Sequence, residues 1–107
     1  MTVRLYTSPA ARDDRREIGS YLYGETYDRD LVRRWFTSVR AETAYAVEYP
    51  RQTPPLIGFS NRPEGPLRRR IITGFKNYLL FYRFDENTVT VTRILHGSRD
   101  LRRVPDL

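Results

Sequence analysis

A run of five apolar residues, Tyr78 to Tyr82, constrains the fold more than any other part of the sequence. The run is rich in residues that favour strands, and it would carry apolar side chains on both faces of an extended chain. A strand of this kind has to be covered on both sides. We therefore predict that residues 78–84 form a central strand, with helices on one face and another part of the chain over the other.

The segments around this run also have strand-like patterns. We predict strands over Arg68 to Thr73 and Thr88 to Leu95, joined to the central strand by turns at Gly74 to Asn77 and Asp85 to Asn87. A short alternating run, Val3 to Tyr6, predicts one more strand near the start of the chain.

Two helices are expected between the first strand and the others. Ser8 followed by Pro9 is a helix start signal, because the serine hydroxyl can cap free N–H groups and proline suits the first turn. The apolar face of this helix is expected to hold Ala11, Ile18, Tyr21 and Leu22, and Gly24 weakens its end.

The second helix is expected to be capped by Asp28 or Asp30 and to end before Pro50. Its apolar stripe follows the helical period and comprises Val32, Trp35, Phe36, Val39, Thr43, Ala46 and Val47. Because Trp35 and Phe36 lie on this stripe, we interpret them as core residues rather than as a ligand site. Arg51 to Pro66 is rich in proline and glycine and is expected to be a loop, either functional or an inert connection.

Together these elements predict an α+β fold in a single domain, residues 1–107. An N-terminal strand and an antiparallel helical hairpin would pack on a small, largely antiparallel sheet. The turn of a few residues between the two helices favours the hairpin arrangement.

The positive charge of the chain is concentrated in its C-terminal part. Residues 1–66 carry ten Lys or Arg against nine Asp or Glu, whereas residues 67–107 carry nine against four. Lys76 is the only lysine, and guanidinium groups favour bidentate contacts with phosphate or carboxylate. An acidic partner is one explanation of this excess, and an arginine-rich proteome is the other.

The composition excludes several classes of site. The absence of cysteine rules out disulfides and thiolate metal sites, and with a single histidine we expect no metal and no cofactor. No run approaches the roughly 20 apolar residues that span a bilayer, and the N-terminus lacks the pattern of a signal peptide. We therefore expect no membrane association and a cytoplasmic location.

The single histidine, His96, lies at the end of the last predicted strand, shortly before Arg99 and Asp100. It could act as a general acid or base, with Arg99 stabilising charge on a phosphorane. Alternatively, His96 donates to a nearby carbonyl and Arg99 pairs with Asp100, which would make the segment purely structural.

The order of elements and three motifs resemble the ParE toxins of bacterial type II toxin-antitoxin systems, within the RelE/ParE superfamily. The motifs are Ser8-Pro9-Ala10 with Ala11 and Asp14, the run Tyr78 to Tyr82, and Leu95-His96-Gly97 with Arg99-Asp100. The last of these is the most specific, and the resemblance covers nearly the whole chain. It implies the RelE/ParE-like fold described above.

The resemblance implies one of two mechanisms. RelE-type members cleave messenger RNA on the ribosome with basic residues and usually a tyrosine after the last strand; here such a site would use His96, Arg99 and Arg70. ParE-type members instead inhibit DNA gyrase, without a catalytic site of their own, and are associated with plasmid stabilisation. Residues 102–107 contain no tyrosine, which favours the ParE mechanism. A degenerate, non-toxic antitoxin-binding module is a third reading.

The resemblance also implies a ParD-like antitoxin, bound in a hetero-oligomer. We expect the target surface to comprise His96, Arg99, Arg102 and Arg103, and the antitoxin surface to comprise Arg68, Arg69, Arg70, Tyr45 and Tyr49. The three arginines 68 to 70 are also expected to extend the basic edge of the target surface. We expect no stable sequence-specific binding of nucleic acid by the toxin alone.

Overall fold

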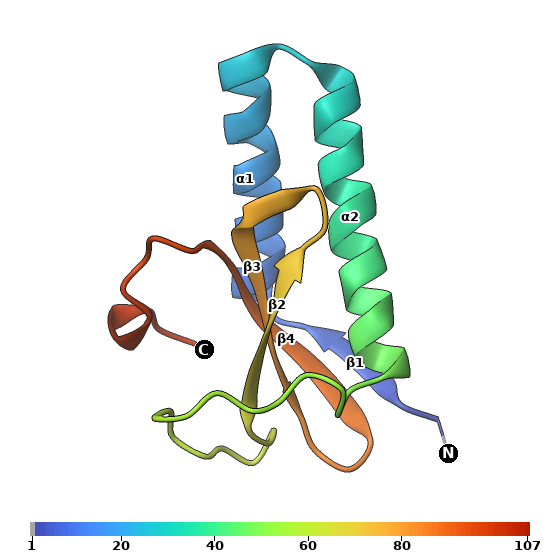
Figure 1. Ribbon diagram of the computed structural model, residues 1–107, viewed down its shortest axis with the longest axis vertical. Coiled ribbons are helices and arrows are strands. Elements are labelled where there is room, and N and C mark those ends of the chain that lie inside the picture. The colour runs from blue at the N-terminus through green and yellow to red at the C-terminus, as the bar shows by residue number, and fades with distance from the viewer. Residues whose placement is uncertain (1) are drawn as a thin grey trace.

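The computed structural model describes residues 2–107 and has the predicted α+β architecture (Figure 1). A mixed four-stranded sheet has the order β1-β4-β3-β2. In chain order the elements are β1 (Arg4–Thr7), α1 (Pro9–Thr26), α2 (Arg29–Glu48), β2 (Leu67–Ile72), β3 (Phe75–Phe84), β4 (Thr88–His96) and the short 3-10 helix η1 (Leu101–Arg103).

The sheet confirms the central position of the apolar strand. β3 lies between β2 and β4 and is antiparallel to both, whereas β1 pairs with β4 in parallel. The predicted turn at Gly74 to Asn77 is wrong, because β3 already begins at Phe75 and the turn is limited to Thr73 and Gly74. Gly74 has a φ of 82°, which glycine adopts without steric cost and which allows the tighter turn.

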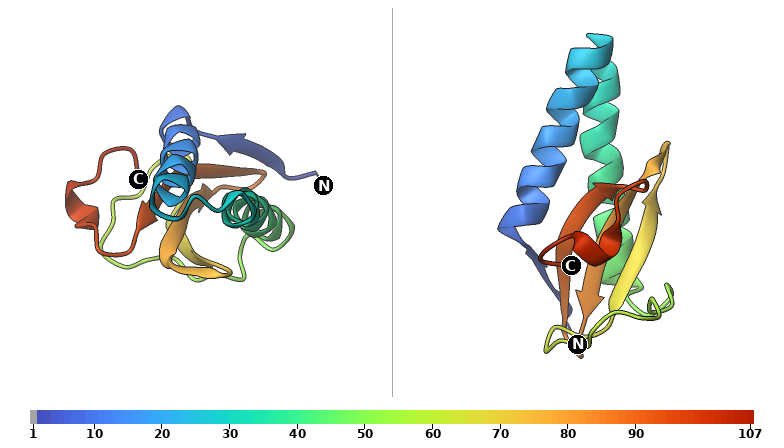
Figure 2. Two further views of the ribbon diagram at one scale, coloured as in Figure 1. Left: turned by 90° about the horizontal axis from the view of Figure 1, so that it is seen from above. Right: turned by 90° about the vertical axis from the view of Figure 1, so that its left-hand side faces the viewer.

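The two helices form the predicted hairpin, and only Tyr27 and Asp28 lie between them. The Ser8 hydroxyl caps α1 by accepting the Ala11 N–H, and the Asp28 carboxylate caps α2 by accepting the N–H groups of Asp30 and Leu31. The hairpin lies against one side of the sheet and projects beyond it (Figures 1 and 2).

The core between hairpin and sheet contains the residues that alternation places on one face of the strands. Trp35 is fully buried; its indole N–H donates to the Arg15 carbonyl at 3.0 Å, and its ring packs edge-on against Phe75 and Tyr78. The interpretation of Trp35 as a core residue is therefore confirmed. Tyr21, predicted to be on the buried face, is 58% exposed because it lies at the border of that face.

A second core covers the opposite face of the sheet. It contains Leu67, Leu79, Phe81, Leu95, Val104 and Leu107, with Leu56, Phe59 and Leu101 packed against it. The covering layer predicted for this face thus consists of the 51–66 loop and the C-terminal segment, residues 97–107. In Figure 2 this segment lies across the sheet on the side away from the hairpin.

Buried Arg83 fastens both parts of this covering layer. Its guanidinium donates to the backbone carbonyls of Leu107, Ser60 and Gly65 at 2.8 to 3.1 Å. Burial lowers the pKa of Arg83, since removal from water disfavours the charged form. A side chain on Gly65 would collide with the Phe84 carbonyl, so only glycine brings the loop close enough to reach Arg83.

Beyond Val91, the edge of β4 is completed by side chains of α1 and its N-cap residue rather than by a strand. β1 pairs with β4 only as far as Val91, after which the Ser8 hydroxyl donates to the Thr92 carbonyl and Asp14 accepts the Ile94 N–H at 3.0 Å. Asp14 also forms a two-pronged ion pair with Arg93 at 2.7 and 2.8 Å. This pair raises the pKa of Arg93.

We predict that Asp14→Ala lowers the free energy of unfolding by about 3 kcal/mol or more. The change leaves the largely buried Arg93 without its carboxylate partner and the Ile94 N–H without its acceptor. Urea unfolding followed by circular dichroism measures the effect. Asp13→Ala is the matched control, because its ion pair with Arg16 is exposed and its loss should cost less than about 1 kcal/mol. Equal losses in the two variants would contradict the proposed edge contact.

Candidate functional site

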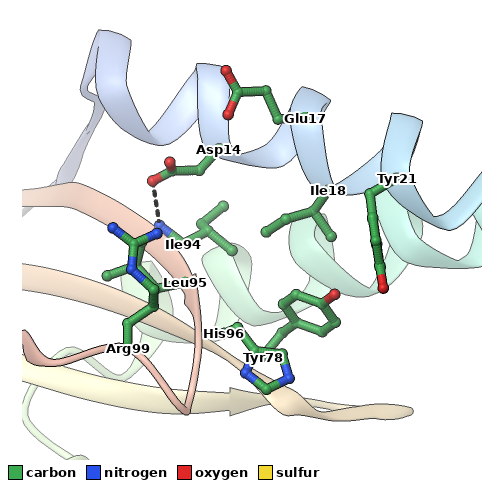
Figure 3. A pocket seen from close by; sticks show the side chains of 9 residues that line it. All are labelled: Asp14, Glu17, Ile18, Tyr21, Tyr78, Ile94, Leu95, His96 and Arg99. Atoms are coloured by element: carbon green, nitrogen blue, oxygen red, sulfur yellow. Dashed lines mark hydrogen bonds between the residues drawn. The ribbon is translucent and has the colours of Figure 1, made fainter.

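A pocket of about 370 Å³ lies between α1 and the end of β4, and we call it the hairpin pocket (Figure 3). It is lined by Asp14, Glu17, Ile18, Tyr21, Tyr78, Ile94, Leu95, His96 and Arg99. The α1 residues are spaced three or four apart and therefore line one stripe of the helix. The position of α1 is in turn fixed by the contact of Asp14 with β4.

His96 belongs to this pocket and is held by the turn that follows it. Its Nδ1 accepts the Ser98 backbone N–H at 3.1 Å and lies 2.7 Å from the Ser98 hydroxyl. In the neutral imidazole the proton is then on Nε2, which leaves that nitrogen as a donor. The structural alternative expected His96 to donate to a carbonyl. In the structure, Nδ1 of His96 instead contacts Ser98.

The Tyr78 ring packs edge-on against His96, with centroids 5.2 Å apart, and also contacts Trp35. Burial raises the pKa of Tyr78, because the phenolate is disfavoured away from water. Tyr78 therefore presents a neutral O–H group to the pocket, opposite Tyr21 of α1 (Figure 3).

Arg99 closes the other side of the pocket (Figure 3). Within residues 2–107, no carboxylate forms an ion pair with it. The pair between Arg99 and Asp100 that the sequence suggested is absent there, since Asp100 instead accepts the Arg102 N–H and lies 3.4 Å from Arg103. The Arg99 guanidinium is thus available to a ligand.

A second cluster lies at the C-terminal end of α2, and we call it the tyrosine patch: Tyr45, Tyr49 and Arg70. The Tyr45 and Tyr49 ring centroids are 5.1 Å apart, and the Arg70 guanidinium carbon lies 3.9 Å from the Tyr45 centroid. Glu42 accepts from Arg70 at 2.8 Å, which fixes the guanidinium in place. Both tyrosines remain partly exposed, at 37% and 44%.

The other predicted arginines do not form one continuous edge. Arg68 is buried beside the tyrosine patch and donates to the Thr53 carbonyl. Arg69 is exposed and, by strand alternation, lies on the opposite face of the sheet. Arg102 and Arg103 are exposed on η1, where Arg102 donates to the Gly58 carbonyl.

For the possible nuclease set, the structure brings His96 and Arg99 together in the hairpin pocket. Arg70 is not among the residues that line this pocket, and it lies on β2, which β3 separates from β4. Across residues 2–107, no group of three His, Cys, Asp or Glu side chains is arranged to hold a metal ion. None of the helices described is long and apolar enough to cross a membrane.

Sequence reasoning did not single out Glu17, or Tyr21 as part of a site, although both line the hairpin pocket. Their spacing relative to Asp14 and Ile18 was visible in the sequence. What the sequence does not show is that this stripe of α1 faces the end of β4, some 80 residues further along the chain.

The fold and these surfaces define a small α+β domain that offers arginine and tyrosine side chains to a partner. The family model of the ParE toxin of type II toxin-antitoxin systems, parDE, matches residues 5–101. The chain therefore belongs to the ParE toxin family, and membership implies an antitoxin partner. A search of the curated proteins gives no match.

We predict that the Tyr78 phenol ionises above the ordinary tyrosine pKa of about 10. Because the folded-state pKa is the higher one, the contribution of Tyr78 to stability is complete below the unfolded pKa and is lost as the pH rises through the folded pKa. Ultraviolet titration of the protein and of Tyr78→Phe gives the difference curve of this phenol. A difference curve centred at or below 10 would contradict the prediction.

Proposed function

We propose that this chain is a cytoplasmic toxin that inhibits DNA gyrase and is neutralised by a ParD-like antitoxin encoded beside it. The observation that carries the proposal is membership of the ParE family together with the absence of tyrosine from residues 97–107. A role in plasmid stabilisation would follow from such a pair. On this proposal, the toxin acts through a binding surface and has no catalytic site.

The packing of the C-terminal segment supports this choice. Val104 and Leu107, which follow the last strand, are buried in the second core. Arg93 and Arg83 hold the segment through the carbonyls of Pro105 and Leu107. The segment therefore covers apolar side chains of the sheet, whereas a nuclease would need its C-terminal groups open to an RNA phosphate.

We propose that gyrase is bound by His96, Arg99, Arg102 and Arg103, which follow one another from the end of β4 into η1. All four are exposed. Arginine is enriched among the residues that dominate binding energy at interfaces, and clustered positive charge speeds encounter with a charged partner.

We predict that Arg99→Gln raises the toxin concentration needed to inhibit gyrase by at least about tenfold. Loss of an arginine anchor costs on the order of 1 to 2 kcal/mol or more at an interface. The measurement is supercoiling of relaxed plasmid by purified gyrase. Arg34→Gln is the control, since Arg34 is exposed on α2 away from the proposed surface. Undisturbed supercoiling at large toxin excess would reject gyrase as the target.

A second candidate function is ribosome-dependent mRNA cleavage, because His96 and Arg99 share one pocket with Glu17. Proton transfer and charge stabilisation could both be served there. Primer extension on translated message distinguishes it from gyrase inhibition by the appearance of new RNA ends. If expression without the antitoxin does not arrest growth, and neither gyrase inhibition nor RNA cleavage is detected, the chain is a non-toxic antitoxin-binding module.

We propose that the antitoxin covers the tyrosine patch, with Arg68 behind it and Arg69 on the neighbouring sheet face. An antitoxin segment that orders on binding loses conformational entropy, so it needs large anchors and complementary charge. Partly exposed, mutually packed tyrosines beside an arginine supply both.

We predict that Tyr45→Ala with Tyr49→Ala weakens binding of the antitoxin at least about tenfold in calorimetry. The control is Tyr23→Ala with Tyr27→Ala, which removes a second exposed tyrosine pair at the far end of the hairpin. Charge reversal of Arg69 and Arg70 is also expected to weaken binding. Reversal at Arg70 also breaks its ion pair with Glu42. The single variant Arg69→Glu avoids this, because it leaves that internal contact intact. Unchanged dissociation constants in the tyrosine and Arg69 variants would place the antitoxin elsewhere.

A further inference from the structure

We propose that the hairpin pocket binds an aromatic side chain together with a neighbouring carboxylate from a segment of a protein partner. The floor of the pocket is apolar and consists of Ile18, Ile94 and Leu95. Aromatic groups surround it, with Tyr21 on one wall and Tyr78 and His96 on another (Figure 3). A volume of about 370 Å³ is within the range of sites that take small organic ligands and is ample for one large side chain.

The polar groups of the pocket favour a carboxylate. Asp14 is neutralised by its two-pronged contact with Arg93, so its charge is not available to a ligand. Arg99, by contrast, has no carboxylate partner among residues 2–107, and guanidinium groups bind carboxylates through two parallel hydrogen bonds. The neutral phenol of Tyr78 adds a hydrogen-bond donor at the other end of the pocket, next to Tyr21 (Figure 3).

The surroundings favour a protein over a nucleic acid. Nucleic-acid backbones are bound by several cations that each contact a phosphate. Here Glu17 lines the pocket, and of the nearby basic side chains Arg93 pairs with Asp14 and Arg16 with Asp13. A single arginine without a carboxylate partner among residues 2–107, in a pocket that also has Glu17 on its lining, suits one carboxylate on an apolar stem better than a row of phosphates.

This inference rests on the proposed function only for the identity of the partner, because it deepens the role of Arg99 and His96 at the target surface. The chemistry of the pocket can be tested without gyrase or antitoxin. If supercoiling stays undisturbed while the pocket binds its ligand, gyrase is rejected as the target and the pocket proposal stands. If gyrase is inhibited but the pocket binds no ligand, the pocket proposal is rejected and gyrase remains the target.

The test titrates the full-length, isotope-labelled chain with indole-3-acetate, followed by amide chemical shifts. Indole-3-acetamide and tryptamine share the ring but are neutral and cationic, and a thymidine dinucleotide represents nucleic acid. We expect indole-3-acetate to move the amides of Ile18, Tyr21, His96 and Arg99, and to bind at least about fivefold more tightly than either analogue.

Arg99→Gln should remove this preference for the carboxylate, whereas Arg34→Gln, which changes an exposed arginine on α2, should keep it. Unchanged amide dispersion shows that each variant is folded. The proposal is overturned if tryptamine binds as well as indole-3-acetate, if Arg99→Gln keeps the preference, or if no pocket amide moves at tens of millimolar. Tighter binding of the dinucleotide at the same amides would assign the pocket to nucleic acid instead.

Discussion

The contact of Asp14 with the edge of β4 is the constraint on which the other surfaces depend. β1 is too short to pair with the whole of β4, and an open strand edge next to a helix would leave N–H groups unsatisfied. Ser8 supplies the missing donor and Asp14 the missing acceptor, so α1 is fixed in both position and rotation. Because Glu17, Ile18 and Tyr21 follow on the same stripe of α1, this contact also sets one wall of the hairpin pocket.

The arginine excess of the C-terminal part divides into two kinds of residue. Arg83 and Arg93 donate to backbone carbonyls or to Asp14 within the fold, Arg70 pairs with Glu42 of α2, and Arg68 donates to the Thr53 carbonyl. A rigid fork of donors lets one arginine join several distant segments, which lysine would do less well. The charge left for a partner is therefore carried by a smaller, exposed set that includes Arg69, Arg99, Arg102 and Arg103.

Local patterns predicted the elements well, because caps, helical stripes and strand alternation depend on neighbouring residues. The limits lay in contacts between distant residues. Thr92 forms a bulge opposite Phe81 and Tyr82, so that Val91 and Ile94 both face the hairpin although they are three apart. Asp14 and Arg93 are separated by 79 positions. Alternation alone gives neither the bulge nor the pair, and the hairpin pocket depends on both.

The C-terminal segment combines a packing role with an exposed face. In residues 97–107, the side chains with a packing role are Leu101, Val104 and Leu107, which complete the second core. Arg83 secures the end of the segment at the cost of burying its own charge, and its lowered pKa reflects that burial. The same segment keeps Arg99, Arg102 and Arg103 exposed, so its apolar side chains serve the core and its arginines lie at the surface.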